Sequence, residues 1–313
     1  MRNDLQSGFS VYIRDMLEQR ELLGYSIAEY RKKLGSFDRF CAANCPGVAA
    51  LTRDLVFAWC NDARGNGGML RASVIRGFGR YLRSTGEDAY VLPASFFPHK
   101  KAAIPHIFTC GELKRFFDAA DRYPACSRSP LLEYTVPVIF RLQYACGMRP
   151  QEVRLLRRMD FDFDAGTIYI FKGKHNKDRK LAADPGIMGI CRRFDRIAET
   201  MLPSRAYFFQ TPSGGAYQGD WLSDTFHKCW NMSGNGNVRG RCTPYSFRHS
   251  YATQTLMRWV EEGKDLDAMI PYLSTYMGHE SFSATYYYTH LLPERVARMD
   301  FTSTSGVIPE VSQ

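Results

Sequence analysis

A membrane-spanning helix needs an apolar run of about 18 residues. In this sequence Arg, Lys or Asp interrupts the long apolar runs before they reach that length. Its first residues also lack the charged-then-apolar pattern of a secretory signal. We therefore expect a cytoplasmic chain with no membrane partner. Acidic residues are fewer than basic ones, 32 against 41, and the formal net charge of +9 indicates an anionic partner, most commonly a phosphate backbone.

Close cysteine pairs are absent as well. The nine cysteines are scattered without a Cys-x-x-Cys pair, which predicts reduced, partly buried thiols rather than a disulfide scaffold. Cys41 and Cys45 are near enough to begin a metal site, but zinc sites usually show a second close pair of ligands. We therefore expect no metal site and no cofactor.

Five short stretches with chemically useful side chains follow one another in the second half of the chain. They are residues 147–152, 173–177, 245–249, 277–279 and 286–290. Two guanidiniums can hold the non-bridging oxygens of a phosphate, a lysine can protonate a leaving oxygen, imidazoles can move protons, and a phenol can attack phosphorus. Together these side chains predict cleavage of a phosphodiester without metal.

The ordered set resembles the tyrosine recombinases, the phage-integrase-like family. Their catalytic domain carries an Arg, a Lys, a His-x-x-Arg-His, a Gly-His and, nine residues after that last His, a Tyr followed by Thr-His. The resemblance implies that Arg149 and Arg248 clamp the phosphate and that Lys174 is the general acid. It also implies that His279 contacts the phosphate and that Tyr288, nine residues later, is the nucleophile.

One position departs from the family pattern. Three residues before the second arginine the family usually has His or Lys, whereas this chain has Tyr245. A phenol can still donate a hydrogen bond to phosphate, so Tyr245 stays a catalytic candidate whose part in proton transfer is open. Glu152 and His249 match supporting positions. Successive helical residues are turned about 100° apart, so one of the three consecutive tyrosines can face a pocket, and the spacing selects Tyr288.

At 313 residues the chain is long enough for two domains. Apolar residues recur at helical spacing around residues 9–17, 27–40, 51–59 and 74–82, which predicts a helical DNA-binding domain over residues 1–88. Residues 89–105 are rich in proline and lack periodicity, so we expect a linker whose Lys100 and Lys101 contact DNA. Residues 106–300 are expected to form the catalytic domain. Residues 301–313 are expected to form a tail, with a neighbouring subunit as its candidate docking site.

Residues 167–171 are β-branched and aromatic, and the stretch after them is basic, which predicts a β-hairpin with a basic tip. The fold expected for the chain is therefore mainly α with a small β-sheet. Lys174 lies at the tip, where two other lysines compete with it for the role of acid. These lysines and two arginines beside a later loop are the further candidates for DNA contact: Lys172, Lys177, Arg239 and Arg241.

Two helix starts are predicted with particular clarity. Thr109 is followed three residues later by Glu112, the pattern of a capping box. Arg149 stands just before Pro150, a residue that suits the first position of a helix. Backbone amides at such a start are favourable for a phosphate.

The function that the resemblance implies is site-specific DNA recombination through a 3′-phosphotyrosyl intermediate, in integration, excision or transposition of a mobile element. The implied partners are double-stranded DNA and further copies of the chain, as a dimer on one site and a tetramer in the synaptic complex. Accessory DNA-bending or directionality proteins are candidate partners, and the expected location is the nucleoid. Two alternatives stay open: a type IB topoisomerase, and a non-catalytic DNA-binding accessory protein, which Tyr245 favours.

Overall fold

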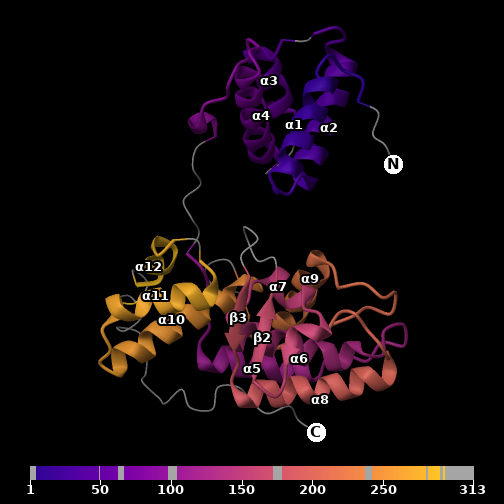
Figure 1. Ribbon diagram of the computed structural model, residues 1–313. Coiled ribbons are helices and arrows are strands. Elements are labelled where there is room, and N and C mark those ends of the chain that lie inside the picture. Colours follow the sequence, from indigo (N-terminus) through magenta and orange to yellow (C-terminus); the bar gives the residue numbers. More distant parts are fainter. Residues whose placement is uncertain are drawn as a thin grey trace. The chain divides into compact units, whose positions relative to one another are not determined.

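The computed structural model describes residues 5–48, 50–62, 67–97, 104–171, 178–236, 242–279, 281–289 and 292. The chain divides into two compact units, Met1–Ala102 and Ala103–Gln313 (Figure 1). Both are largely helical, and the second contains a small antiparallel sheet, so the predicted fold class is confirmed. In the described ranges, no helix is long and apolar enough to cross a membrane.

The described part of the first unit contains four α-helices around one apolar core. Their bounds are α1 Ser10–Leu22, α2 Ala28–Asn44, α3 Arg53–Asn61 and α4 Gly67–Ser84, followed by the 3-10 turn η1 Ala94–Phe96. Each helix covers most of one segment that apolar periodicity predicted. Phe9, Phe37, Phe78 and Trp59 are fully buried, and their ring centroids lie 5.2–6.2 Å apart where they touch.

The second unit packs helices around a three-stranded sheet. Its helices are α5 Cys110–Asp121, α6 Leu132–Ala145, α7 Pro150–Leu155, α8 Pro185–Met201, α9 Gly219–Met232, α10 Tyr245–Glu261, α11 Leu266–Met277 and α12 Ser283–Thr289, with the 3-10 turn η2 Arg158–Asp160. The strands are β1 Phe161–Asp162, β2 Thr167–Ile170 and β3 Arg179–Ala182 in the order β1-β2-β3. Strands β2 and β3 pair antiparallel, with Ile170 opposite Arg179, which confirms the predicted hairpin.

Helix α6 lies at the centre of this unit, in contact with α5, α7, α8 and α10. Its Phe140 packs against Phe116, Phe226 and Phe247, and all four are fully buried. Because α6 ends at Ala145 and Gly147 has a φ of +58°, the chain turns within a few residues into α7. A large apolar core therefore fixes the start of α7 and the first half of α10, the two places from which the predicted arginines come.

Both predicted helix starts are present. Thr109 and Glu112 form a capping box, in which the Glu112 carboxylate accepts a hydrogen bond from the Thr109 amide at 2.8 Å. Arg149 is the N-cap of α7 and Pro150 its first residue, while Glu152 Oε2 accepts from the Arg149 amide at 2.8 Å. This last bond already brings the carboxylate of Glu152 back toward Arg149.

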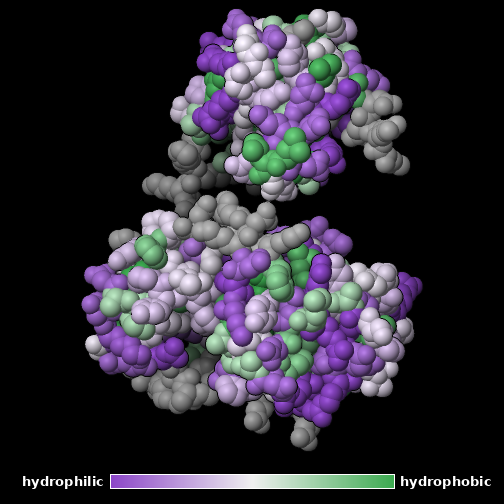
Figure 2. Space-filling model, viewed as in Figure 1, coloured by the Kyte–Doolittle hydropathy of each residue, from purple (hydrophilic) through white to green (hydrophobic). Residues whose placement is uncertain are grey.

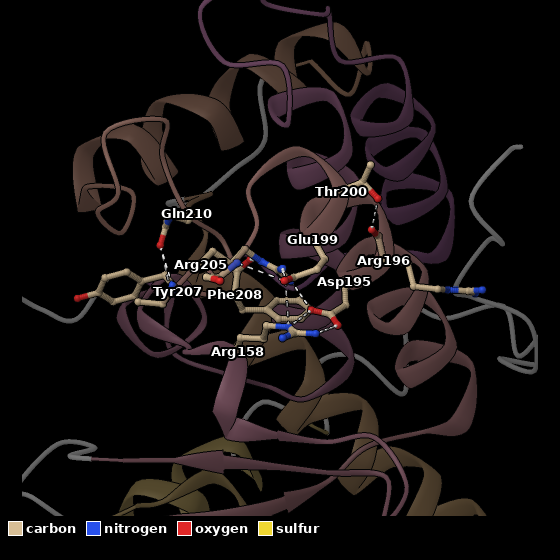
Figure 3. Close-up of polar contacts among 11 residues, drawn as sticks. Arg158, Asp195, Arg196, Glu199, Thr200, Arg205, Tyr207, Phe208 and Gln210 are labelled. Carbon is tan, nitrogen blue, oxygen red and sulfur yellow. Dashed lines mark hydrogen bonds and ion pairs between the residues drawn. The ribbon is translucent and has the colours of Figure 1, made fainter.

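Helix α8 is joined by ion pairs to two segments that lie against it. Its apolar side is buried, and its exposed side belongs to the hydrophilic surface of the second unit (Figure 2). Arg205, in the segment after α8, is buried and forms ion pairs with Asp195 and Glu199 of that helix (Figure 3). Arg158 of η2 donates to Asp195 at 3.0 Å. These bonds hold the segment after α8 and the turn before β1 against the helix.

Candidate active site

Four elements far apart in the sequence supply the site. Arg149 stands at the start of α7, Arg248 and His249 lie on α10, His279 follows the end of α11, and Tyr288 lies on α12. Direct contacts connect these elements. The Arg149 guanidinium donates to the Gly278 carbonyl at 2.6 Å, and His249 Nδ1 lies 3.0 Å from the Tyr288 hydroxyl oxygen. The structure therefore brings these five predicted residues together.

Arg248 is fully buried and forms the centre of the site. Its guanidinium donates to the carbonyls of Gly147 at 2.8 Å and Met277 at 2.7 Å, while its Nε has no hydrogen-bond partner among the described residues. Burial, and then the charge of Arg149, lower the pKa of Arg248 to about 10. A buried cation with a free N–H beside a second cation is a favourable position for an anion.

The other arginine is oriented by a buried carboxylate. Glu152 receives the Arg149 guanidinium at 2.7 Å and the Arg179 guanidinium on both oxygens, at 2.9 and 2.8 Å. Burial acts to raise the pKa of Glu152, but the hydrogen bonds and charge of Arg179, followed by the bonds from Arg149, outweigh it and lower the pKa to about 2. Glu152 is thus ionised and holds Arg149 in place.

Arg179 is a residue that the sequence analysis missed. Besides Glu152, its guanidinium binds the carbonyl of Tyr276 in the last turn of α11, at 2.9 Å. Gly278 ends this helix with a φ of +66°, and a side chain there would meet the Arg179 guanidinium at 2.9 Å. Glycine is therefore required both by the left-handed backbone and by the close approach. Arg179 stands just after the hairpin's basic tip, which is the signal that could have drawn attention to it.

His279 follows Gly278 directly and is held by α12. Its Nδ1 lies 2.7 Å from the hydroxyl of Thr285, a second residue that the sequence analysis missed, and its ring stacks on Tyr288 with centroids 6.2 Å apart. Burial, then the charges of Arg248 and Arg149, lower the pKa of His279 from 6.5 to about 3. The imidazole is therefore neutral near pH 7 and can donate a hydrogen bond without adding a charge.

Tyr288 is packed among apolar residues of α10 and α11 and is 3% exposed, whereas Tyr286 and Tyr287 are 40% and 39% exposed. Its hydroxyl lies against His249, as described above. Burial raises the pKa of the Tyr288 phenol to about 12, although the charge of Arg248 partly opposes the rise. Near neutral pH the phenol is thus protonated, and any reaction at its oxygen needs a group that removes the proton.

Tyr245 is the first residue of α10 and is 39% exposed. Its ring centroid lies 5.2 Å from that of His249. Both rings line a surface pocket of about 520 Å³ between the starts of α7, α9 and α10. Tyr245 therefore stands at an open edge of the site, where its side chain is partly exposed.

Several predicted residues lie outside the described residues: Lys174, Lys172, Lys177, Lys100, Lys101, Arg239 and Arg241. The tail at residues 301–313 lies outside them too. In the part of the chain that the structure describes, no group of three or more His, Cys, Asp or Glu is placed to hold a metal ion. All nine cysteines are described and unpaired.

The Glu152 cluster allows a stability prediction. Glu152→Gln should lower the free energy of unfolding by about 3–5 kcal/mol, because it removes a buried anion that lies between two partly buried cations. A carboxyl whose pKa falls from 4.5 to about 2 on folding contributes stability that is present above pH 4.5 and lost as the pH falls toward 2. Urea unfolding of the parent and of Glu152→Gln should therefore show a difference in unfolding free energy near pH 7, and this difference should become smaller in acid.

The matched control is Glu262→Gln, which removes an exposed carboxylate that pairs with Lys264 at 2.6 Å. Surface pairs contribute little, so this variant should unfold like the parent. Equal losses of unfolding free energy in the two variants would contradict the role given to Glu152. A difference between Glu152→Gln and the parent that does not change with pH would contradict it too.

Comparison with known proteins agrees with this geometry. Residues 107–295 match the model of the phage integrase family, which is more than half of the chain. The integrase/recombinase y4rB of Sinorhizobium fredii is 27% identical over 298 residues, covering 92% of this chain and 94% of that protein. The tyrosine recombinase XerC of Nitrobacter winogradskyi is 27% identical over 238 residues, covering 75% and 70%.

A solved structure shares the fold across both units. The XerH site-specific recombinase bound to palindromic difH substrate has a TM-score of 0.61 at 18% identity, and the match covers 91% of this chain and 82% of that one. The family match spans all the described site residues, from Arg149 to Tyr288. The chain therefore belongs to the phage integrase family, the tyrosine recombinases, which are DNA strand-exchange enzymes.

Proposed function

We propose that the chain is a site-specific DNA recombinase that cuts and rejoins DNA through a 3′-phosphotyrosyl intermediate, in integration, excision or transposition of a mobile element. The observation that carries this proposal is the pairing of a buried phenol with a buried guanidinium that has no carboxylate partner among the described residues. Tyr288 supplies an oxygen nucleophile, and Arg248 supplies a charge and a free N–H for the phosphate beside it.

In the proposed reaction Arg149 and Arg248 hold the non-bridging oxygens of the scissile phosphate, and His279 donates a further hydrogen bond. The Tyr288 oxygen attacks phosphorus, and the bond to the 5′ oxygen breaks. Lys174 is the proposed acid that protonates this leaving oxygen. A 5′ hydroxyl from another duplex then attacks the phosphotyrosyl bond, which retains the energy of the broken linkage, so that no nucleotide cofactor is required.

The partners proposed for the chain are double-stranded DNA and further copies of itself. Lambda integrase, a structural neighbour, has been solved as a dimer bound to a core site and as a tetramer bound to a Holliday junction. We propose the same progression here, with a dimer on one site and a tetramer in the synaptic complex. Accessory DNA-bending or directionality proteins and a location in the cytoplasm, on the nucleoid, belong to the same proposal.

Each expected domain has its own proposed role. Residues 1–88 would bind DNA, and residues 106–300 would carry out catalysis. Residues 89–105 would link these two domains, and Lys100 and Lys101 in the linker would contact the DNA backbone. Residues 301–313 would dock on a neighbouring subunit. Further backbone contacts are proposed for Lys172, Lys177, Arg239 and Arg241. Such contacts would neutralise phosphates, so affinity should fall steeply with salt.

A plasmid assay tests the function against its alternatives. DNA fragments bound by the protein are recovered from the genome that encodes it, and two copies of a recovered site are placed in one supercoiled plasmid. A recombinase excises or inverts the intervening segment. Relaxation of any plasmid without such products would instead indicate a topoisomerase, and binding without strand breakage would indicate an accessory protein.

Tyr245 has its own prediction within this proposal. If its exposed hydroxyl donates to the phosphate, Tyr245→Phe should slow cleavage by roughly 10²–10³-fold, the usual effect of losing one such donor, without abolishing it. Rates are measured as formation of covalent complex on a nicked duplex carrying the recovered site. The matched control is Tyr272→Phe, at a tyrosine of α11 that is 70% exposed. Cleavage by Tyr245→Phe at the parental rate would show that this ring only packs.

A further inference from the structure

The Tyr288 hydroxyl must lose its proton before or while it binds phosphorus. Because burial raises the pKa of this phenol to about 12, the ionised form is scarce near neutral pH. At the position where the family usually has His or Lys, this chain has Tyr245, whose side chain lacks the basic nitrogen of those residues. The chain therefore needs another group that can accept a proton from Tyr288.

Among the described residues, Arg248, His279 and His249 interact with Tyr288, and they differ in what they can accept. Arg248 is a cation with donors only. His279 stacks on the face of the Tyr288 ring, and its Nδ1 is engaged with Thr285 at 2.7 Å. His249 Nδ1 lies 3.0 Å from the Tyr288 hydroxyl oxygen, in hydrogen-bond contact. His249 is thus the group whose lone pair can point at the proton that must leave.

We propose that His249 is the proton acceptor of Tyr288 in cleavage and its proton donor in rejoining. This inference rests on the proposed function, because it names the base of that same reaction. In the family pattern the basic residue usually stands where this chain has Tyr245. Here the base would be His249, which follows Arg248 and lies one helical turn beyond Tyr245 on α10. Tyr245 then keeps only the role of a hydrogen-bond donor.

The electrostatics of His249 suit this role. Burial, and then the charge of Arg248, lower the pKa of His249 from 6.5 to about 4, so the free ring is neutral and able to accept. Among the described residues, the titratable groups close to it are Arg248 and Tyr245 on the same helix, Tyr288 on α12 and His279 after α11. A DNA phosphate bound at Arg248 adds negative charge, which raises the pKa of His249 and makes it a better base once substrate is present.

The surroundings of His249 also provide a route to solvent. When Nδ1 accepts the proton, Nε2 is the second ring nitrogen that carries one. The ring lines the open pocket of about 520 Å³ that Tyr245, Ser246 and Ser223 also line. Water in that pocket can exchange protons with the imidazole, so the imidazolium that rejoining requires can form again after a proton is lost to solvent.

The proton and bond changes balance in both directions. In cleavage the O–H bond of Tyr288 breaks, its proton goes to His249 Nδ1, the bond from the phenolic oxygen to phosphorus forms, and the bond to the 5′ oxygen breaks. The 5′ oxygen takes a proton from the proposed acid, Lys174. In rejoining the 5′ hydroxyl returns that proton and attacks phosphorus, while the imidazolium protonates the departing phenolic oxygen.

The first test is His249→Asn. The Asn side-chain oxygen stands near the position of Nδ1 and can still accept a hydrogen bond from Tyr288, but it cannot take up a proton. Covalent capture of a nicked duplex carrying the recovered site should slow by roughly 10²–10⁴-fold, the usual contribution of a general base, with unchanged DNA affinity. Capture at the parental rate would overturn the inference. Failure of the parental protein to form any covalent complex would instead overturn the proposed function.

The second test separates proton transfer from structural support. His249→Ala removes the ring beside an open pocket, so free imidazole can diffuse to the vacant position. Added imidazole should raise the rate of capture by roughly 10-fold or more. As the pH changes, this rescued rate should follow the concentration of neutral imidazole. Absence of rescue in a variant that binds DNA and melts like the parent would show that His249 only supports the site.

The third test distinguishes the base from the acid. A substrate with sulfur in place of the bridging 5′ oxygen releases a thiolate, which leaves without an acid because thiols ionise far more readily than alcohols. Lys174→Ala should recover its rate on this substrate, whereas His249→Asn should stay slow. Recovery of His249→Asn would place His249 on the leaving-group side and overturn the inference.

Discussion

Tyr288→Phe is expected to abolish covalent capture of DNA while leaving DNA affinity and stability close to those of the parent. The substitution removes a single oxygen, the atom that would bond to phosphorus. The ring itself remains packed among Leu256, Leu273 and Met277, where Tyr288 is 3% exposed. Losing the hydrogen bond to His249 should cost about 1 kcal/mol, too little to unfold the domain.

Tyr287→Phe is the matched control, since it deletes the same atom from the neighbouring residue, which is 39% exposed. It should capture DNA at the parental rate. The two variants are compared by gel separation of covalent complexes on a nicked duplex, alongside equilibrium binding. Capture that persists in Tyr288→Phe and disappears in Tyr287→Phe would show that the nine-residue spacing from His279 selects the wrong tyrosine.

The second large effect is expected for Arg248→Met, which should slow capture by about 10³-fold or more. This substitution keeps the length and apolar character of the side chain but removes its charge and an Nε–H that has no partner among the described residues. The clamp would then consist of Arg149 alone. Single-turnover cleavage with saturating protein measures the loss directly.

Stability should respond much less than activity to this change. Arg248→Met leaves the carbonyls of Gly147 and Met277 without their donors, but it also removes a charge whose burial is unfavourable. Because the two effects oppose each other, the free energy of unfolding should change by less than about 2 kcal/mol. Arg258→Met on the same helix is the control, as its side chain is 60% exposed. Equal capture by the two variants would contradict the clamp.

Local signals in the sequence were sufficient for the elements that carry the site. The Thr109 capping box, the Arg149–Pro150 helix start and the hairpin at residues 167–182 each depend on residues close together in the chain. Short-range hydrogen bonding and turn chemistry decide such features, so they can be recognised without knowing the fold. Helical periodicity implied that one of the three consecutive tyrosines faces a pocket, and the family's nine-residue spacing from His279 selected Tyr288, which is the buried one.

The contacts that make the site could not be predicted in this way. Glu152 and Arg179 are 27 residues apart, and His249 and Tyr288 are 39 residues apart. Whether such side chains meet depends on how the α11–α12 segment packs against α10 and β3, which no local pattern encodes. Hence the sequence analysis treated His249 as a supporting residue and did not consider Arg179, although the structure places both in direct contact with predicted site residues.

The most direct test of the account is to identify the amino acid that carries DNA in the covalent complex. Tryptic digestion after nuclease treatment should yield the peptide between Lys264 and Arg295, which contains Tyr272, Tyr276 and the three consecutive tyrosines. Fragmentation in the mass spectrometer is expected to place a nucleotide on Tyr288 through its 3′ phosphate. A nucleotide on any other tyrosine, or one linked through a 5′ phosphate, would contradict the account.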